Sequence, residues 1–130
     1  GHPLARHSTV RLRDCLAYPL CLPSIQYGVR QLLNQTMARR GETLAPVLQS
    51  DSFEFLRHTV RDNEQITFQI EVGLKVDRDD GSYIHRPIDQ RDLPGGTLHL
   101  SQLRGRVLPV AAARFADQLV TVFQDRFQCL

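Results

Sequence analysis

The chain of 130 residues is long enough to fold as one domain around a real hydrophobic core. Hydrophobic residues make up 42% and charged residues 23%, as in an ordinary soluble globular protein. No apolar run approaches the roughly 18 residues that a transmembrane helix needs. The net charge of +2 is too small to indicate binding to nucleic acid or to a membrane surface.

The cysteines indicate a reducing compartment. Cys15, Cys21 and Cys129 are odd in number and contain no Cys-x-x-Cys pair, which argues against a disulfide framework. The N-terminus carries no secretory signal pattern, so we expect a cytoplasmic protein. Cys21 lies in an apolar run and is predicted to be a small core residue rather than a nucleophile.

The first third of the chain predicts a strand followed by a helix. Residues 10–16 suit a short helical turn, with Thr9 or Ser8 as its expected cap. The run Leu20–Leu22 has the length of a buried strand, which Pro23 ends because proline donates no backbone hydrogen bond. A helix over about 28–40 follows and stops at Gly41. Its expected apolar face consists of Val29, Leu32, Leu33, Thr36 and Met37.

The loop between this strand and this helix is the candidate binding site. Ser24 and Gln26 offer a hydroxyl and an amide directly before the helix N-terminus. Unpaired backbone N–H groups and the helix dipole favour an anion at such a place. A plain strand-to-helix joint that binds nothing fits the same residues, and the stretch alone leaves both interpretations open.

Alternating strands and helices are predicted for the middle of the chain. Residues 44–49 suit a short strand whose Pro46 indicates a sheet edge or a late strand start. Asp51 and Glu54 are close to a capping box for a helix over about 52–61. The alternation in 66–70 predicts a strand. Its core-facing residues are Ile66, Phe68 and Ile70, and its other face carries Thr67 and Gln69.

The last half of the chain continues this alternation. A brief helix is expected at 71–76, and 77–81 is predicted to be a solvated turn because it lacks the ligand register of a calcium loop. Strands are expected at 83–88 and 97–100, joined by a loop at 89–96. A long helix then begins at Pro109. Its apolar face is Ala112, Phe115, Leu119, Val122 and Phe123. The pattern favours an α/β fold with a mostly parallel sheet flanked by helices.

Short motifs spread over nearly the whole chain occur in the order of one known family. They are His2-Pro-Leu-Ala5, Val10-x-Leu-x-x-x-Leu16, Tyr18-Pro-Leu-x-Leu-Pro23, Gly28-Val-Arg-x-Leu-Leu33, Pro46-Val with Asp51-Ser52, the helix end at Val60, Ile66–Ile70, Arg86-Pro-Ile-Asp89 and Gly105-Arg-x-Leu-Pro-x-Ala-Ala-x-x-Phe115. By this ordered set the chain resembles the effector-binding (regulatory) domain of LysR-type transcriptional regulators.

The resemblance implies a fold like that of the type II periplasmic binding proteins, in which two α/β lobes hold a small effector in the cleft between them. By this comparison 1–130 is a fragment of the regulatory domain. Residues 17–96 correspond to the second lobe, and 97–130 correspond to the return strand and the final helix. The helix-turn-helix DNA-binding domain of the family lies outside this sequence.

The resemblance also implies effector-binding positions. These are Ser24 and Gln26 before the helix, and Thr67 and Phe68 on the following strand, although the alternation also favours Phe68 as a core residue. The chain departs from the family pattern in two places. Asn63-Glu-Gln65 replaces a common Gly-x-Gly turn, so side chains occupy positions where the backbone would approach a ligand closely. Ile70 stands where a proline often follows the strand.

The function implied is sensing of a small molecule, with the effector a small anion or carboxylate and the regulator a homo-oligomer. No enzyme activity, cofactor or metal is expected, because no catalytic motif appears and the five histidines have no metal-ligand spacing. The apolar face of the last helix predicts self-association when lobe one is absent. A solute-binding protein of the same fold, or a stand-alone α/β domain, remains the alternative.

Overall fold

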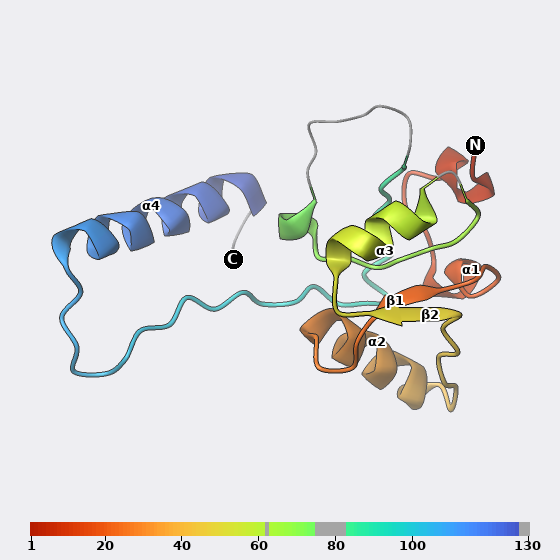
Figure 1. The fold of residues 1–130 in the computed structure, drawn as a ribbon, viewed down its shortest axis with the longest axis horizontal. Helices are drawn as coiled ribbons and strands as arrows, with labels where there is room; N and C mark the ends of the chain where they lie inside the picture. Colours follow the sequence, from red (N-terminus) through yellow and green to blue (C-terminus); the bar gives the residue numbers. More distant parts are fainter. Residues whose placement is uncertain (62, 75–82, 128–130) are drawn as a thin grey trace. The chain divides into compact units, whose positions relative to one another are not determined.

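The computed structural model describes residues 1–61, 63–74 and 83–127. The chain divides into two compact units, Gly1–Gly95 and Gly96–Leu130 (Figure 1). Unit 1 contains, in order, η1 (Pro3–Arg6), α1 (Leu12–Cys15), β1 (Cys21–Pro23), α2 (Gly28–Arg39), β2 (Leu48–Ser50), α3 (Phe53–Val60) and η2 (Glu71–Gly73). Unit 2 contains α4 (Val110–Phe127).

A small parallel sheet lies at the centre of unit 1. β1 pairs with β2 in parallel, with Cys21, Leu22 and Pro23 opposite Leu48, Gln49 and Ser50. Two further parallel bridges join Leu20 to Ile66 and Val10 to Ile88. In Figure 1, α2 and α3 flank the paired strands on opposite sides, and both contact β1. The α/β class predicted from the sequence is therefore present, in the form of a short sheet.

Burial explains why the sequence of β1 is continuously apolar. All three of its residues are buried, because helices cover the strand on both faces and leave no side chain in water. The hydrophobic core forms around this strand and the inner face of α2. Its buried members are Val10, Leu12, Cys15, Leu20, Leu22, Leu33, Met37 and Phe68.

The helix α2 ends as its glycine predicts. Gly41 has φ +68°, a conformation that costs an L side chain energy. The Gly41 N–H donates to Ala38 O and the Glu42 N–H to Met37 O, both at 3.0 Å, which completes a Schellman motif. The buried face differs from the predicted one: Arg30 is buried together with Leu33, Thr36 and Met37, whereas Val29 and Leu32 are half-buried.

Two predicted helix caps are wrong. α3 is capped by Ser52, whose Oγ accepts the Phe55 N–H at 3.1 Å, so Asp51 lies one residue too early to be the cap. α1 has Arg11 at its cap position without a side-chain cap. A carboxylate from far along the chain, Asp92, accepts the first N–H of that helix instead.

The predicted strands outside β1 and β2 are reduced or absent in the described residues. Residues 66–70 and 83–88 each keep one bridge, and 97–100 form no strand. A strand persists only where a neighbour accepts its hydrogen bonds, and the described parts of these stretches have almost none. Ile70 is accordingly 52% exposed, against the core position predicted for it.

Several remaining predictions shift by a few residues. β1 covers Cys21–Pro23 instead of the predicted Leu20–Leu22, and its last residue Pro23 pairs with Ser50. β2 begins at Leu48, four residues later than the predicted start at Leu44. The brief helix expected at 71–76 is the 3-10 turn η2, Glu71–Gly73. The predicted turn at 77–81 lies outside the described residues. None of the helices in the described ranges has both the length and the apolar character that crossing a membrane requires.

In unit 2, α4 leaves part of its predicted apolar face exposed: Ala112, Leu119 and Phe123 are half-buried, but two other residues are not. It begins directly after Pro109, whose carbonyl accepts the Ala113 N–H at 2.9 Å. No described residue of α4 is buried. Phe115 and Val122 of the predicted apolar face are 65% and 53% exposed.

The core of unit 1 predicts a clear stability difference between two truncations. Leu33→Ala removes a side chain that is 0% exposed and leaves a cavity between α2 and β1. We expect a loss of about 3 kcal/mol in the free energy of unfolding, measured by urea titration. Val47→Ala, at a position 63% exposed, is the control and costs under about 0.5 kcal/mol. Equal losses for both variants contradict this core.

Candidate functional site

Two loops meet at the carboxyl ends of the parallel strands. Residues 24–27 follow β1 and residues 51–52 follow β2. The Ser24 N–H donates to Ser50 O at 3.2 Å, and the Tyr27 N–H donates to Ser24 O at 3.1 Å. Open α/β sheets bind their ligands beyond this edge. The predicted residues Ser24 and Gln26 therefore lie at the edge where such a site belongs.

Tyr27 fastens the first loop to the second. Its hydroxyl donates to Asp51 O at 3.0 Å, and its ring meets the ring of Phe53 edge-on, with centroids 5.0 Å apart. Gln26 Nε2 lies 3.4 Å from Asp51 Oδ1, a long contact at the surface. The Ser24 hydroxyl has no hydrogen-bond partner among the described residues and is free to contact a ligand.

The N-terminus of α2 opens on the same loop. Tyr27, at the cap position, provides no side-chain cap, and the first N–H groups of a helix have no partner within it. The first turn of α2 therefore points backbone donors toward Ser24–Tyr27. This arrangement favours an anion over a cation.

Arg30 adds a buried positive charge in the first turn of α2. It is 6% exposed, and its guanidinium donates to Pro23 O at 3.0 Å, Gln49 Oε1 at 2.9 Å and Asn34 Oδ1 at 3.1 Å. All three acceptors are neutral, and no carboxylate pairs with Arg30 among the described residues. The charge is thus hydrogen-bonded but not neutralised, which makes the potential near the loop more positive.

The structure places the other two predicted site residues apart from this loop. Thr67 and Phe68 follow the bridge residue Ile66 and line a cavity of about 980 Å³ in unit 1. Ser24 and Gln26 are not among its described lining residues. Phe68 is 6% exposed and belongs to the core, while the Thr67 hydroxyl is buried without a partner. No hydrogen bond joins the two pairs in the described part of the chain.

The comparison with known proteins identifies the family. The model of the LysR substrate binding domain matches residues 1–124. The chain belongs to this family. No curated protein and no solved structure gives a significant match. LysR substrate-binding domains have a fold like that of periplasmic binding proteins and belong to transcription regulators, and the α/β unit with its parallel strands agrees with that fold.

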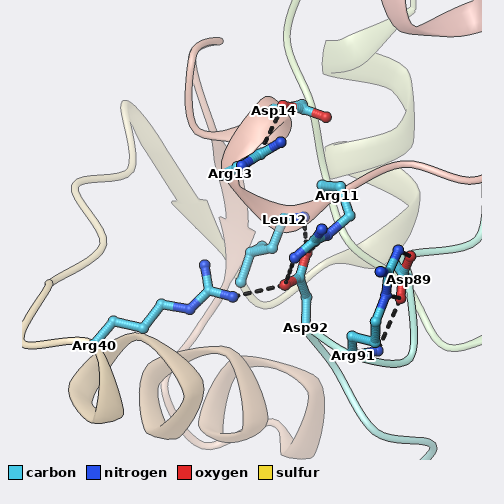
Figure 2. Close-up of polar contacts among 8 residues, drawn as sticks. All are labelled: Arg11, Leu12, Arg13, Asp14, Arg40, Asp89, Arg91 and Asp92. Carbon is cyan, nitrogen blue, oxygen red and sulfur yellow. Dashed lines mark hydrogen bonds and ion pairs between the residues drawn. The ribbon is translucent and has the colours of Figure 1, made fainter.

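A buried carboxylate is the strongest electrostatic feature of this LysR substrate-binding domain. The Asp92 side chain is 1% exposed. Figure 2 shows the side chains of Arg11 and Arg40 pointing toward it. Its Oδ2 accepts Arg11 Nε at 2.7 Å and the Leu12 N–H at 2.8 Å. Its Oδ1 accepts Arg11 Nη2 at 2.8 Å and Arg40 Nη2 at 2.7 Å. We call Arg11, Asp92 and Arg40 the arginine–aspartate cluster.

These donors determine how the acidic residues titrate. The hydrogen bonds from Arg11, with those from the Leu12 N–H and Arg40, hold the pKa of Asp92 far below its ordinary value, against the effect of burial. Near the surface, Arg91 binds Asp89 and lowers the pKa of that carboxyl to about 2. Both carboxylates therefore remain charged well into acid.

The cysteines of the described residues are unsuited to catalysis. Cys15 and Cys21 are buried free thiols. Burial, followed by the nearby charge of Asp14, raises the pKa of Cys15 to about 11, and burial also raises the pKa of Cys21. A thiol reacts as its thiolate, so neither is an activated nucleophile. No group of three or more potential metal ligands occurs within the described ranges.

Sequence reasoning missed Arg30 and Asp92 for different reasons. Arg30 carried a usable signal, because it lies three and seven residues before Leu33 and Met37 and so shares their helix face. The sequence around Asp92 carries no such signal. Its partner Arg11 is 81 residues away, and a polar turn is normally expected to be exposed.

The depressed pKa of Asp92 predicts the acid sensitivity of this domain. A group whose pKa is lowered by folding stabilises the protein above its ordinary pKa, here 3.8, and that stabilisation is lost as the pH falls below this value. Asp92→Asn should lower stability at pH 7 and reduce by about one the number of protons taken up on unfolding between pH 4 and pH 2.

The measurement is a series of urea titrations from pH 7 to pH 2. Asp14→Asn is the control, because the Asp14 side chain is 46% exposed and lies 3.6 Å from Arg13. It should change neither the stability nor its pH dependence appreciably. A pH dependence of Asp92→Asn equal to that of the parent contradicts the role assigned to this carboxylate.

Proposed function

We propose that this LysR substrate-binding domain senses a small anionic effector, most simply a carboxylate, at the loop of Ser24–Tyr27. One observation carries the proposal: an uncapped N-terminus of α2 and the buried, un-neutralised Arg30 converge on a loop with a free hydroxyl. A carboxylate there receives hydrogen bonds from backbone amides and from Ser24, and it balances the charge of Arg30.

The proposed mechanism is a shift of population between two arrangements of the regulator. The effector binds one arrangement better and so increases its share, without any covalent chemistry. The response then passes to a separate helix-turn-helix domain, which binds DNA. Gln26 contributes its amide as a second donor at the loop. The resemblance also assigns Thr67 and Phe68 to the effector, but in the described structure they line the cavity of unit 1 and not this loop, so the proposal rests on Ser24 and Gln26.

We also propose that the regulator acts as a homo-oligomer. The support comes from unit 2, where α4 carries exposed Phe115 and Val122 on one predicted face. Apolar side chains uncovered to this extent on a single helix are typical of surfaces that pack against another protein surface. Size-exclusion chromatography with light scattering of the chain and of its Phe115→Glu variant examines this part of the proposal separately from effector binding.

The effector site predicts opposite effects for two nearby substitutions. Small aliphatic and aromatic mono- and dicarboxylates are titrated into the 130-residue protein at low salt by calorimetry. Ser24→Ala should weaken binding of the best carboxylate about tenfold, the value of one hydrogen bond to a charged group. Asp51→Asn should strengthen it severalfold, because the Asp51 carboxylate beside Gln26 repels an incoming anion.

Ser8→Ala is the matched control, since Ser8 is exposed and belongs to a different part of the chain. It should bind the same carboxylate as tightly as the parent does. The proposed function is wrong if no carboxylate in the series binds, or if Ser24→Ala and Asp51→Asn both leave the affinity at the level of this control.

A further inference from the structure

The arginine–aspartate cluster joins three segments that are distant in the sequence. Arg11 and the Leu12 N–H come from the start of α1, Asp92 from the turn after Ile88, and Arg40 from the residue after α2 (Figure 2). Backbone bonds run beside it: the Val10 N–H donates to Pro87 O, and the Asp89 N–H donates to Val10 O, both at 2.9 Å.

The cluster lies immediately before the chain leaves unit 1. Unit 1 ends at Gly95, three residues after Asp92. Leu93 is half-buried and its N–H donates to Asp89 O at 3.1 Å, whereas Pro94, Gly95 and Gly96 are exposed. Asp92 is therefore a buried side-chain anchor close to the exit point. We call 93–97 the exit segment.

The helix α2 connects this anchor to the loop of Ser24–Tyr27. It begins at Gly28, directly after that loop, and runs for 12 residues, or about 18 Å. Leu33 and Met37, 0% and 2% exposed, hold it against the core, and its last carbonyls are satisfied by the Schellman motif. A helix fixed in this way moves as a rigid rod, so a displacement at its first turn reaches Arg40.

Arg40 transmits such a displacement because its partner has little freedom. The Arg40 and Arg11 side chains are each 33% exposed, but the carboxylate between them is 1% exposed. If Arg40 withdraws, a buried carboxylate oxygen loses a charged donor that water cannot easily replace. A movement in which Asp92 follows Arg40 therefore costs less free energy than one in which the two side chains separate.

We propose that the arginine–aspartate cluster couples α2 to the exit segment, so that occupancy of the α2 N-terminus changes the order of residues 93–97. Asp92 and Arg40 are positioning residues in this scheme, and neither touches the effector. The coupling rests on the proposed function only in taking the α2 N-terminus as the effector site. A purely structural fastening of the three segments is the competing explanation.

The first experiment cuts the link at Arg40 while it leaves the Arg11–Asp92 pair in place. Hydrogen exchange of the Leu93 amide, the exit-segment N–H that donates to Asp89 O, is measured by NMR in the parent, in Arg40→Met and in Arg39→Met, which changes an exposed neighbour. We expect about tenfold faster exchange in Arg40→Met only, with core amides of β1 unchanged. Arg40→Lys should restore most of the protection, because Arg40 makes one contact with Asp92 Oδ1 and an ammonium keeps that charged donor.

The second experiment tests transmission without any effector. Ser24→Asp places a fixed carboxylate before the α2 N-terminus and so imitates a bound anion. It should change exit-segment exchange severalfold in the parent background and leave it unchanged in the Arg40→Met background. No ligand is added in this experiment, so it tests the coupling separately from effector binding. The coupling can be observed even if no carboxylate binds, and a carboxylate can bind even if no coupling is observed.

The proposal is overturned by either of two results. One is equal exit-segment exchange in Arg40→Met and Arg39→Met, or faster exchange spread evenly over the core, as expected of general destabilisation. The other concerns Ser24→Asp: it leaves exit-segment exchange unchanged in the parent background, or it changes this exchange equally in the parent and Arg40→Met backgrounds. The expected pattern in both experiments supports coupling through Arg40.

Discussion

The carboxylate of Asp92 is the interaction on which the arrangement of unit 1 depends. Removing a carboxylate from water is costly, and it is tolerated only where charged donors and backbone N–H groups replace the lost solvent. Asp92 obtains these donors from α1, from Arg40 and from Arg11. All of these segments must be in place at the same time before the charge is satisfied, so this one residue ties their positions to one another.

The arginines at the two ends of α2 differ in whether a carboxylate neutralises their charge. At the first turn, Arg30 is satisfied by neutral oxygens and keeps its net charge. A guanidinium tolerates this because its charge is delocalised and its donors are spread over a planar group. Beyond the last turn, Arg40 meets a carboxylate that is already paired with Arg11. The positive end of the helix is therefore open to an anion, while its other end is locked to the protein.

The sequence predicted best what local rules decide. The bounds of α2, its stop at Gly41 and the buried run of β1 follow from periodicity, glycine conformation and continuous apolarity. Residues 66–70 do not form the complete strand that their alternation predicts, because a sequence pattern does not show whether a neighbouring strand is present to pair with. The prediction of the α1 cap was wrong for a related reason. The acceptor of the first N–H is Asp92, and no local rule identifies a partner 80 residues away.

The exposure of the loop limits what it can do alone. Ile25 is 62% exposed and Gln26 is exposed, so a carboxylate at the α2 N-terminus keeps much of its contact with water. Under these conditions a helix end contributes only about 0.3–1 kcal/mol, and salt screens it further. The same donors gain strength when a second surface covers the anion and excludes solvent, because the local dielectric constant falls. A loop of this kind works best as one wall of a cleft, since its affinity then increases with closure and binding favours the closed arrangement.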